Sequence, residues 1–309
     1  MQLIRGIHNI RPDHRGCVAT IGNFDGVHLG HRAMLERLRG RADRAGLPAT
    51  VISFEPHPRE FFAPEQAPSR LSSLRDKTRL LAEAGVDRFV CLHFNRELAG
   101  MEPDAFVDDL LIGRLGIRYL LVGDDFRFGR QRRGDHALLQ AASQRHGFTL
   151  DDTPTVSLDG ERVSSTRVRQ ALEYGDLELA ERLLGQPYSV SGRVIHGDRI
   201  GRELGCPTAN IAIHHRPPMD GVAVVEAAID DGAALPAVAS VGTRPTVNGT
   251  RPLCEVHLLD WAGDLYGRRL TVRFLHWLRG QEHYPGLEQL QRQIATDVDD
   301  ARRWFDARR

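Results

Sequence analysis

Up to about residue 185, short apolar runs alternate with longer stretches in which apolar residues recur at helical spacing. The apolar runs predict strands at residues 17–22, 49–54, 88–94 and 117–123. The longer stretches predict helices at residues 31–45, 74–84, 103–115 and 135–146, with two short helices following at 165–173 and 177–184. Such alternation is typical of a doubly wound, mainly parallel sheet with helices on both faces.

After Gln186 the pattern changes to successive apolar runs separated by Gly, Pro and Asp turns. These runs predict strands at residues 188–195, 222–229, 237–241, 253–259 and 270–274. Successive strands without intervening helices are typical of an antiparallel barrel. One face of a C-terminal helix then carries Leu287, Leu290, Ile294, Val298, Ala301 and Phe305. We therefore predict an α/β protein with two domains, residues 1–186 and 187–309.

Composition places the chain among globular proteins, because 41% of its residues are hydrophobic and 27% are charged. No apolar run approaches the ~18 residues of a membrane span, and the polar start Met1–Gly6 predicts no secretory signal. Basic and acidic residues balance at 41 each, which favours neither nucleic-acid nor membrane binding. The cysteines are widely separated and fit a reducing cytoplasm: Cys17, Cys91, Cys206 and Cys254.

The segment Gly22–His31 joins the first predicted strand to the first predicted helix and contains His28, His31 and three glycines. Ligands of parallel sheets bind beyond the carboxyl ends of the strands, and a helix N-terminus attracts anions. If the helix begins near Val27, both imidazoles lie on one face, where they can stabilise charge on a transferring phosphoryl or nucleotidyl group. A helix cap is the alternative. A zinc site is disfavoured because the glutamate of an H-E-x-x-H motif is absent.

Three further segments of the first half carry candidate chemistry. Ser53–Pro58 ends a predicted strand, and Phe61 and Phe62 follow it with flat apolar surface. Gly123–Gly129 ends another strand with two carboxylates, an arginine and two phenylalanines. Ser164–Arg169 opens a helix with hydroxyl and guanidinium groups, which suit the outer phosphates of a nucleotide. Each segment taken singly also fits core packing or helix capping.

In the second half, the stretch from Gly192 to Asn210 is glycine-rich but lacks the G-K-[ST] of a Walker loop. This half holds no lysine, so arginines, a metal and backbone amides must bind the phosphate. The candidate backbone amides are those of Gly197, Gly201 and Gly205. Thr208 and Asn210 offer neutral oxygens for Mg²⁺. The alternative is a Pro-Thr turn leading into a strand.

Two charged side chains of the second half have alternative roles. Glu255 lies in a predicted strand, where an acid usually faces solvent. Opposite a metal-bound γ-phosphate, the same carboxylate can accept the proton of an attacking hydroxyl. Arg279 is either a charged residue on the surface or a residue that contacts phosphate or flavin.

Together, Gly22–His31, Ser53–Pro58, Gly123–Gly129 and Ser164–Arg169 resemble the adenylyltransferase half of prokaryotic bifunctional riboflavin kinase/FAD synthetases. The resemblance implies a Rossmann-like domain that transfers AMP from ATP to FMN and releases pyrophosphate. It implies that His28 and His31 contact the ATP phosphates and that Phe62 and Phe128 flank the isoalloxazine ring. It also assigns a set of further residues to nucleotide binding: Gly22, Asn23, Phe24, Asp25, Asp125, Ser164, Ser165 and Arg169.

From about Tyr188 onward the chain resembles the riboflavin kinase module of the same family. The resemblance is carried by Gly201–Asn210, Gly242–Thr246, Glu255–Asp260 and Asp264–Gly267. It implies a six-stranded barrel with Thr208 and Asn210 at a Mg-ATP site. It further implies that Glu255 activates the terminal ribityl hydroxyl of riboflavin and that Arg279 lies close to the flavin.

We therefore expect a cytoplasmic enzyme that makes FMN and then FAD from riboflavin, with ATP and Mg²⁺ in both steps. A second hypothesis is an FMN adenylyltransferase with a degenerate kinase module, because Ala223 and Cys206 replace the tyrosine and phenylalanine usual in the family. Ser240 is a further departure, at a position where asparagine is common. A third hypothesis is a non-catalytic regulator that binds flavin or nucleotide.

Overall fold

The computed structural model describes residues 1–308 apart from 124, 154, 198–205, 214 and 247–248. The chain divides into two compact units: Met1–Pro68 with Lys77–Val163, and Ser69–Asp76 with Ser164–Arg309. Within the described residues, no helix has the length and apolar character that a membrane crossing requires.

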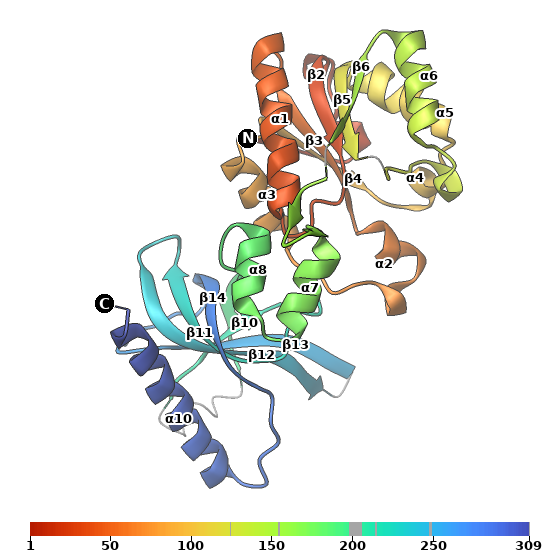
Figure 1. Cartoon of the computed structure of the whole chain (residues 1–309). Coiled ribbons are helices and arrows are strands. Elements are labelled where there is room, and N and C mark those ends of the chain that lie inside the picture. The colour runs from red at the N-terminus through yellow and green to blue at the C-terminus, as the bar shows by residue number, and fades with distance from the viewer. Residues whose placement is uncertain (124, 154, 198–205, 214, 247–248, 309) are drawn as a thin grey trace. The chain divides into compact units, whose positions relative to one another are not determined.

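The described part of the first unit contains a six-stranded parallel sheet with the order β1-β4-β3-β2-β5-β6 (Figure 1). Its strands are β1 (Gln2–Arg5), β2 (Cys17–Ile21), β3 (Ala49–Glu55), β4 (Arg88–His93), β5 (Ile117–Gly123) and β6 (Thr149–Thr153). Its helices are α1 (Leu29–Ala45), α2 (Pro58–Phe62), α3 (Leu74–Glu83), α4 (Arg96–Gly100), α5 (Pro103–Ala105), the π-helical η4 (Phe106–Arg114) and α6 (His136–His146). A small hairpin of β7 (Ser157–Leu158) and β8 (Glu161–Arg162) follows.

The connections reverse direction at the centre of this sheet. The order runs from β2 to β3 and β4 on one side, and then β5 and β6 add on the other side of β2. Figure 1 shows α1 and α3 on one face, and α5 and α6 on the other. The predicted doubly wound fold is therefore confirmed, and the loops after β2 and β5 meet at the switch point where ligands of such sheets bind.

The two outer strands of this sheet were not predicted from the sequence. In β1 only Ile4 is buried, and β6 has no buried residue. Edge strands of this kind lack the apolar run that a central strand shows. The predicted helix at residues 103–115 is present, but its main part, η4, is π-helical and not α-helical.

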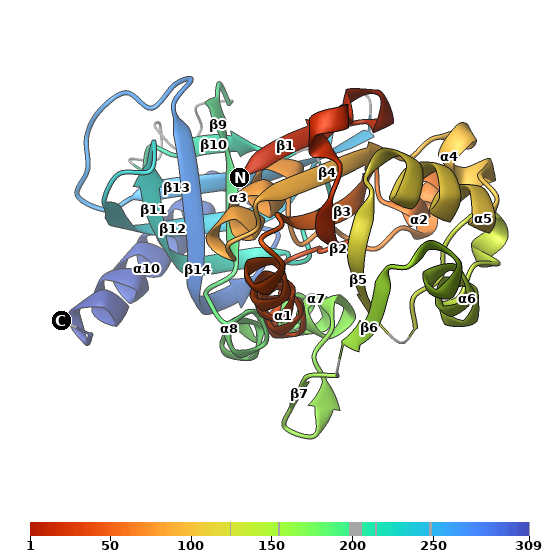
Figure 2. The ribbon, with the colours of Figure 1, turned by 90° about the horizontal axis from the view of Figure 1, so that it is seen from above.

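The second unit contains a closed antiparallel barrel with the strand order β10-β13-β12-β11-β14-β9. The strands are β9 (Ser189–Ile195), β10 (Ala209–Ala212), β11 (Gly221–Ile229), β12 (Ala234–Thr246), β13 (Gly249–Leu258) and β14 (Arg269–Gly280). The helices among the described residues of this unit include α7 (Ser165–Glu173), α8 (Leu177–Leu184) and α10 (Leu287–Asp306). Figure 2 gives a second view of these strands and helices. The barrel confirms the predicted fold of this half.

The structure extends the predicted strands of the barrel. The four-residue β10 adds the sixth strand, which the apolar pattern alone did not predict. The predicted strand that ended at Phe274 continues to Gly280, since Trp277 and Arg279 still pair with β11. His276 and Arg279 interrupt the apolar run there, which is why the pattern ended early.

The C-terminal helix α10 packs on the outer face of the barrel, where Val222, Val224 and Val238 form a buried cluster with Ala301. Val298 and Phe305 pack against this cluster as predicted. Leu287 lies in the helix as predicted but is 66% exposed, because it is in the first turn of α10, which extends away from the strands (Figure 1).

The short helices α7 and α8 belong to the second unit by their contacts. A Cβ added at Gly175, in the turn between them, would lie 2.7 Å from the Trp277 ring, so this turn packs directly against β14. The functional boundary at Gln186 stays a prediction.

Candidate functional sites

The loop between β2 and α1 holds two bulky residues in left-handed backbone conformations. Phe24 has φ +48° and Val27 has φ +43°, and both side chains are fully buried. Such conformations are unfavourable for large and β-branched residues and persist only where the surrounding structure holds them. A Cβ at Gly22 would lie 3.1 Å from the Phe24 ring, so a larger residue there would press on this anchor. The loop that was predicted to bind nucleotide is thus held in a strained, fixed shape.

The two histidines of this loop lie together, but not as predicted. The helix α1 begins at Leu29, and His28 precedes it with an extended backbone (ψ 172°). His28 is the N-cap: its Nδ1 accepts a hydrogen bond from the backbone N–H of His31 at 3.3 Å. The expectation that both imidazoles project from one helical face was therefore wrong. Instead the two rings stack, with their centroids 3.7 Å apart, at the positive end of a 17-residue helix.

The environment of His31 keeps its imidazole neutral. Burial is the largest cause that lowers the pKa of His31 well below 6.5, and the nearby charges of His28 and Lys77 lower it further. Lys77 is the chain's only lysine and is itself buried. Among the described residues, Nδ1 of His31 has no hydrogen-bond partner. A neutral imidazole of this kind is ready to serve a ligand at the helix N-terminus.

The lowered pKa of His31 predicts a pH dependence of stability. Below pH 6.5 the unfolded chain protonates His31 while the folded chain does not, so stability falls as the pH drops from 7 to 5. We expect His31→Asn to reduce this dependence by an amount that grows as the pH falls through 6.5 and approaches about 1.4 kcal/mol per pH unit near pH 5. Urea unfolding of both proteins at pH 7, 6 and 5, followed by circular dichroism, measures the difference. Parallel pH profiles would show that His31 is not the responsible group.

An aromatic cluster lies after the carboxyl ends of β3 and β4. The Phe94 ring contacts the rings of Phe54, Phe61 and Phe62, with centroids 5.5 to 5.8 Å apart. Phe62 nevertheless remains 66% exposed. An exposed aromatic ring supported by others offers a flat apolar surface, which suits the predicted contact with a planar ring system.

Phe128, the other predicted aromatic wall, has a different environment. It is only 5% exposed and belongs to the core of the first unit, where its ring contacts Phe106 and Phe126 at centroid distances of 5.4 and 5.6 Å. A Cβ at Gly134 would lie 2.8 Å from the same ring. The structure thus gives Phe128 a packing role, and its contact with a ligand stays a prediction.

The remaining residues predicted for this site belong to both units, and each has its own local contacts. Asp125 is exposed and lies 3.6 Å from Arg162, whereas its neighbour at 124 lies outside the described residues. Ser164 caps α7 by accepting a hydrogen bond from Arg167 N–H at 3.2 Å. Arg169 donates to the carbonyl oxygen of Ser69 at 2.5 Å. The assignment of Ser164, Ser165 and Arg169 to outer phosphates stays a prediction.

In the barrel, the predicted kinase residues lie in one row across the strands. Asn210 of β10 is opposite Glu255 of β13, and Glu255 is opposite Ser240 of β12. Ser240 is opposite Val222 of β11, which is opposite Arg279 of β14. Directly paired residues of antiparallel strands point to the same face of the sheet. The metal ligand, the base and the arginine predicted from sequence therefore share one face.

A cavity of about 360 Å³ opens along this row, between the outer face of the barrel and α10. Thr208, Glu255 and Arg279 all line it. Asn210 is 8% exposed, and a Cβ at Gly197 would lie 2.3 Å from its Nδ2, so only glycine fits beside this amide. The other two predicted glycines, Gly201 and Gly205, lie outside the described residues.

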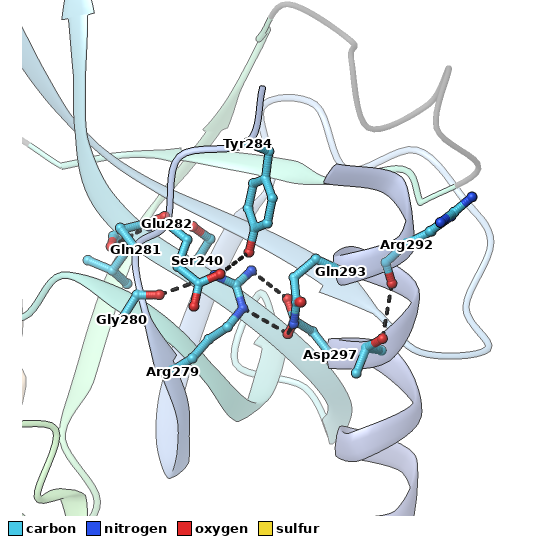
Figure 3. A network of polar contacts seen from close by, with 11 residues as sticks. Ser240, Arg279, Gly280, Gln281, Glu282, Tyr284, Arg292, Gln293 and Asp297 are labelled. Atoms are coloured by element: carbon cyan, nitrogen blue, oxygen red, sulfur yellow. Dashed lines mark hydrogen bonds and ion pairs between the residues drawn. The ribbon is translucent and has the colours of Figure 1, made fainter. Parts of the chain in front are cut away.

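The cavity also contains residues that the sequence did not reveal. Arg279 forms two hydrogen bonds with Asp297 of α10, and the loop between β14 and α10 contributes Gln281 and Tyr284 (Figure 3). One signal could have identified Asp297, since it is an acid between the apolar positions Ile294, Val298 and Ala301 of an amphipathic helix.

Comparison with known proteins agrees with the division of the chain into an α/β half and a barrel half. A FAD synthetase family model matches residues 10–167, and a riboflavin kinase model matches residues 184–305. A bifunctional riboflavin kinase/FMN adenylyltransferase of Pseudomonas fluorescens is 54% identical, covering 98% of this chain and 97% of that protein. The protein of the same name from Escherichia coli K12 is 49% identical, covering 99% and 98%.

A solved structure has the same fold over nearly the whole chain. It is described as a macrolide-efflux protein from Streptococcus pneumoniae, with a TM-score of 0.81, 28% identity, and coverage of 98% of this chain and 100% of that one. The relatives match this chain over nearly its full length, and both family models match in the order of the two sites. The chain therefore belongs to the bifunctional riboflavin kinase/FMN adenylyltransferase family and carries both enzymatic modules.

Proposed function

We propose that this bifunctional enzyme phosphorylates riboflavin at the Glu255 cavity of the barrel and adenylylates the resulting FMN beside His28 and His31 at the start of α1. The observation that carries the proposal is the row in which Asn210, Glu255 and Arg279 share one face, with Glu255 and Arg279 lining one cavity. A base, neutral oxygen donors and a cation are the groups that phosphoryl transfer to a hydroxyl needs.

In the kinase step, Glu255 accepts the proton of the terminal ribityl hydroxyl while its oxygen attacks the γ-phosphorus of ATP and ADP leaves. Thr208 and Asn210 would hold Mg²⁺. Their neutral oxygens beside a carboxylate fit a hard cation that shares its other positions with phosphate and water. When bound, the ion neutralises charge on the transferred phosphate. Backbone amides at Gly197, Gly201 and Gly205 meet the nucleotide.

In the second step, a phosphate oxygen of FMN attacks the α-phosphorus of ATP, and the bond to pyrophosphate breaks. His28 and His31 stabilise the charge that develops there, together with the N-terminus of α1. Phe62 and Phe128 flank the flavin ring. The other groups assigned to the nucleotide are Gly22, Asn23, Phe24, Asp25, Asp125, Ser164, Ser165 and Arg169.

We also propose a cytoplasmic location with small-molecule substrates only, namely riboflavin, FMN and ATP. Free thiols at Cys17, Cys91, Cys206 and Cys254 support this location, because an oxidising compartment favours disulfides.

A time course with riboflavin, ATP and Mg²⁺ tests the proposal, with FMN and FAD resolved by chromatography. We expect FMN to appear first and FAD to follow, and both to stop when EDTA removes the metal. If FMN never forms but supplied FMN is adenylylated, the kinase module is degenerate, as Ala223 and Cys206 allow. If neither product forms, the chain is a non-catalytic binder.

A further inference from the structure

The C-terminal helix α10 carries a buried carboxylate on its barrel-facing side. Asp297 is only 5% exposed, although its neighbours Ile294 and Val298 are apolar and its face of the helix packs on the barrel. A carboxylate loses its hydration when it is buried, so it remains there only with strong compensating partners. Asp297 therefore has a role that packing alone does not explain.

Its main partner is Arg279 of β14 (Figure 3). Arg279 Nε donates to Oδ1 of Asp297 at 2.9 Å, and Nη2 donates to Oδ2 at 2.7 Å. Gln293, one turn earlier in α10, donates to Oδ1 at 3.0 Å. Burial lowers the pKa of Arg279, but the hydrogen bonds and charge of Asp297 outweigh this effect, and the pKa is raised overall. A two-point pair of this kind fixes both the charge and the plane of the guanidinium.

The loop after β14 completes the surroundings of this guanidinium. The Tyr284 ring centroid lies 5.8 Å from Cζ of Arg279, and the Tyr284 hydroxyl donates to Glu282 Oε2 at 2.6 Å. Gln281 Nε2 donates to Ser240 Oγ at 2.9 Å, which ties the loop to β12. Both the loop and α10 therefore hold one end of the cavity in a defined shape.

The Arg279 guanidinium still has hydrogen-bonding capacity. It carries five N–H groups, and its contacts with the described residues are two bonds to Asp297 and one from Nη1 to the carbonyl oxygen of Gly280 at 3.1 Å. Two N–H groups thus remain for a ligand among the described contacts. The side chain is 16% exposed and lines the cavity, so a ligand there can reach it.

Arg279 and Glu255 can contact different parts of one elongated substrate. Three strand-to-strand steps separate the two residues along the row, and both line the same cavity. Riboflavin carries its reactive hydroxyl at the end of the ribityl chain and its ring carbonyls at the far end of the molecule. With the hydroxyl at Glu255, the ring carbonyls extend toward Arg279.

We propose that Asp297 is a positioning residue of the kinase, which holds the Arg279 guanidinium in the orientation that receives the flavin ring. The proposal rests on the kinase function proposed above. It assigns α10 to recognition of riboflavin and not to recognition of ATP, because Arg279 and Asn210 lie at opposite ends of the row.

The test uses the full-length protein with Asp297→Asn, which keeps the side chain's shape but removes its charge and one acceptor. We expect the riboflavin Kd, measured by quenching of flavin fluorescence, and the riboflavin KM to rise roughly 10- to 100-fold. The KM for ATP should stay unchanged. Arg279→Lys keeps a cation beside Asp297 without the two-point geometry and should weaken riboflavin binding similarly, and the double variant should be no weaker than either single one.

Glu288→Gln is the matched control, because it breaks an exposed ion pair with Arg292 on the same helix and should change nothing. Adenylylation of supplied FMN by each variant shows that the chain is folded. An unchanged riboflavin Kd in Asp297→Asn or Arg279→Lys, equal rises in KM for riboflavin and ATP, or additive losses in the double variant would overturn the proposal. If the wild-type protein makes no FMN, the kinase function itself fails instead.

Discussion

Replacing Glu255 with glutamine is expected to slow riboflavin phosphorylation by about 10²- to 10⁴-fold, the usual contribution of a general base. Glutamine has nearly the same shape and still accepts hydrogen bonds, but it does not take up a proton from the substrate. Glu255 pairs with Asn210 and Ser240 through the strand backbones, so a change in its side chain leaves this pairing intact. Initial rates of FMN formation at saturating ATP measure the effect.

Adenylylation of supplied FMN by the Glu255→Gln protein should remain at the wild-type rate, because the other module carries it out. Glu226→Gln is a suitable control: Glu226 also lies in a barrel strand but does not line the cavity. Phosphorylation at a wild-type rate by Glu255→Gln would remove Glu255 from the catalytic role, whereas an equal loss in the Glu226 variant would indicate general damage to the barrel.

Replacing His28 with asparagine is expected to lower FAD formation from FMN by about 10²- to 10³-fold, the loss that follows removal of one preorganised charge-stabilising group. Asparagine is a good N-cap residue, so it preserves the start of α1 while it removes the imidazole that stacks on His31. His28→Ala removes both functions and should cost a further ~1 kcal/mol of stability. Rates of FAD formation and the midpoints of thermal unfolding separate these two effects.

FMN formation from riboflavin should be nearly intact in both His28 variants. The exposed His8 of the same unit provides the control, because His8→Asn should affect neither activity. Loss of both activities in a folded His28→Asn protein would contradict two independent sites.

The loop from Gly22 to His31 shows how far the sequence carried the interpretation. Its glycines and its position after an apolar run placed it at the carboxyl edge of a parallel sheet, and the strand order confirms this position. The predicted arrangement of its histidines was wrong, because the His28 backbone is extended and its side chain caps the helix. A helix start depends on the ψ angle of single residues, and local sequence does not determine that angle.

The outer strands of the sheet and the polar contacts of the cavity could not be predicted from the sequence. Strands β1 and β6 together have one buried residue and no apolar run to detect, so only pairing with β4 and β5 makes them strands. Similarly, the partner of Arg279 lies 18 residues away on a different element. Asp297 is visible in the sequence only as an acid among apolar positions.

By itself, then, the sequence determined the two fold classes, since apolar periodicity reports directly which residues each element buries. It also predicted which segments bind phosphate and metal, because residue type limits what a side chain can bind, and these assignments stay predictions. Only the tertiary structure decided that Asn210, Glu255 and Arg279 share one face and that Asp297 fixes one end of it. Strand register and helix docking are long-range properties, and no local pattern encodes the pairing of residues that meet only after the chain has folded.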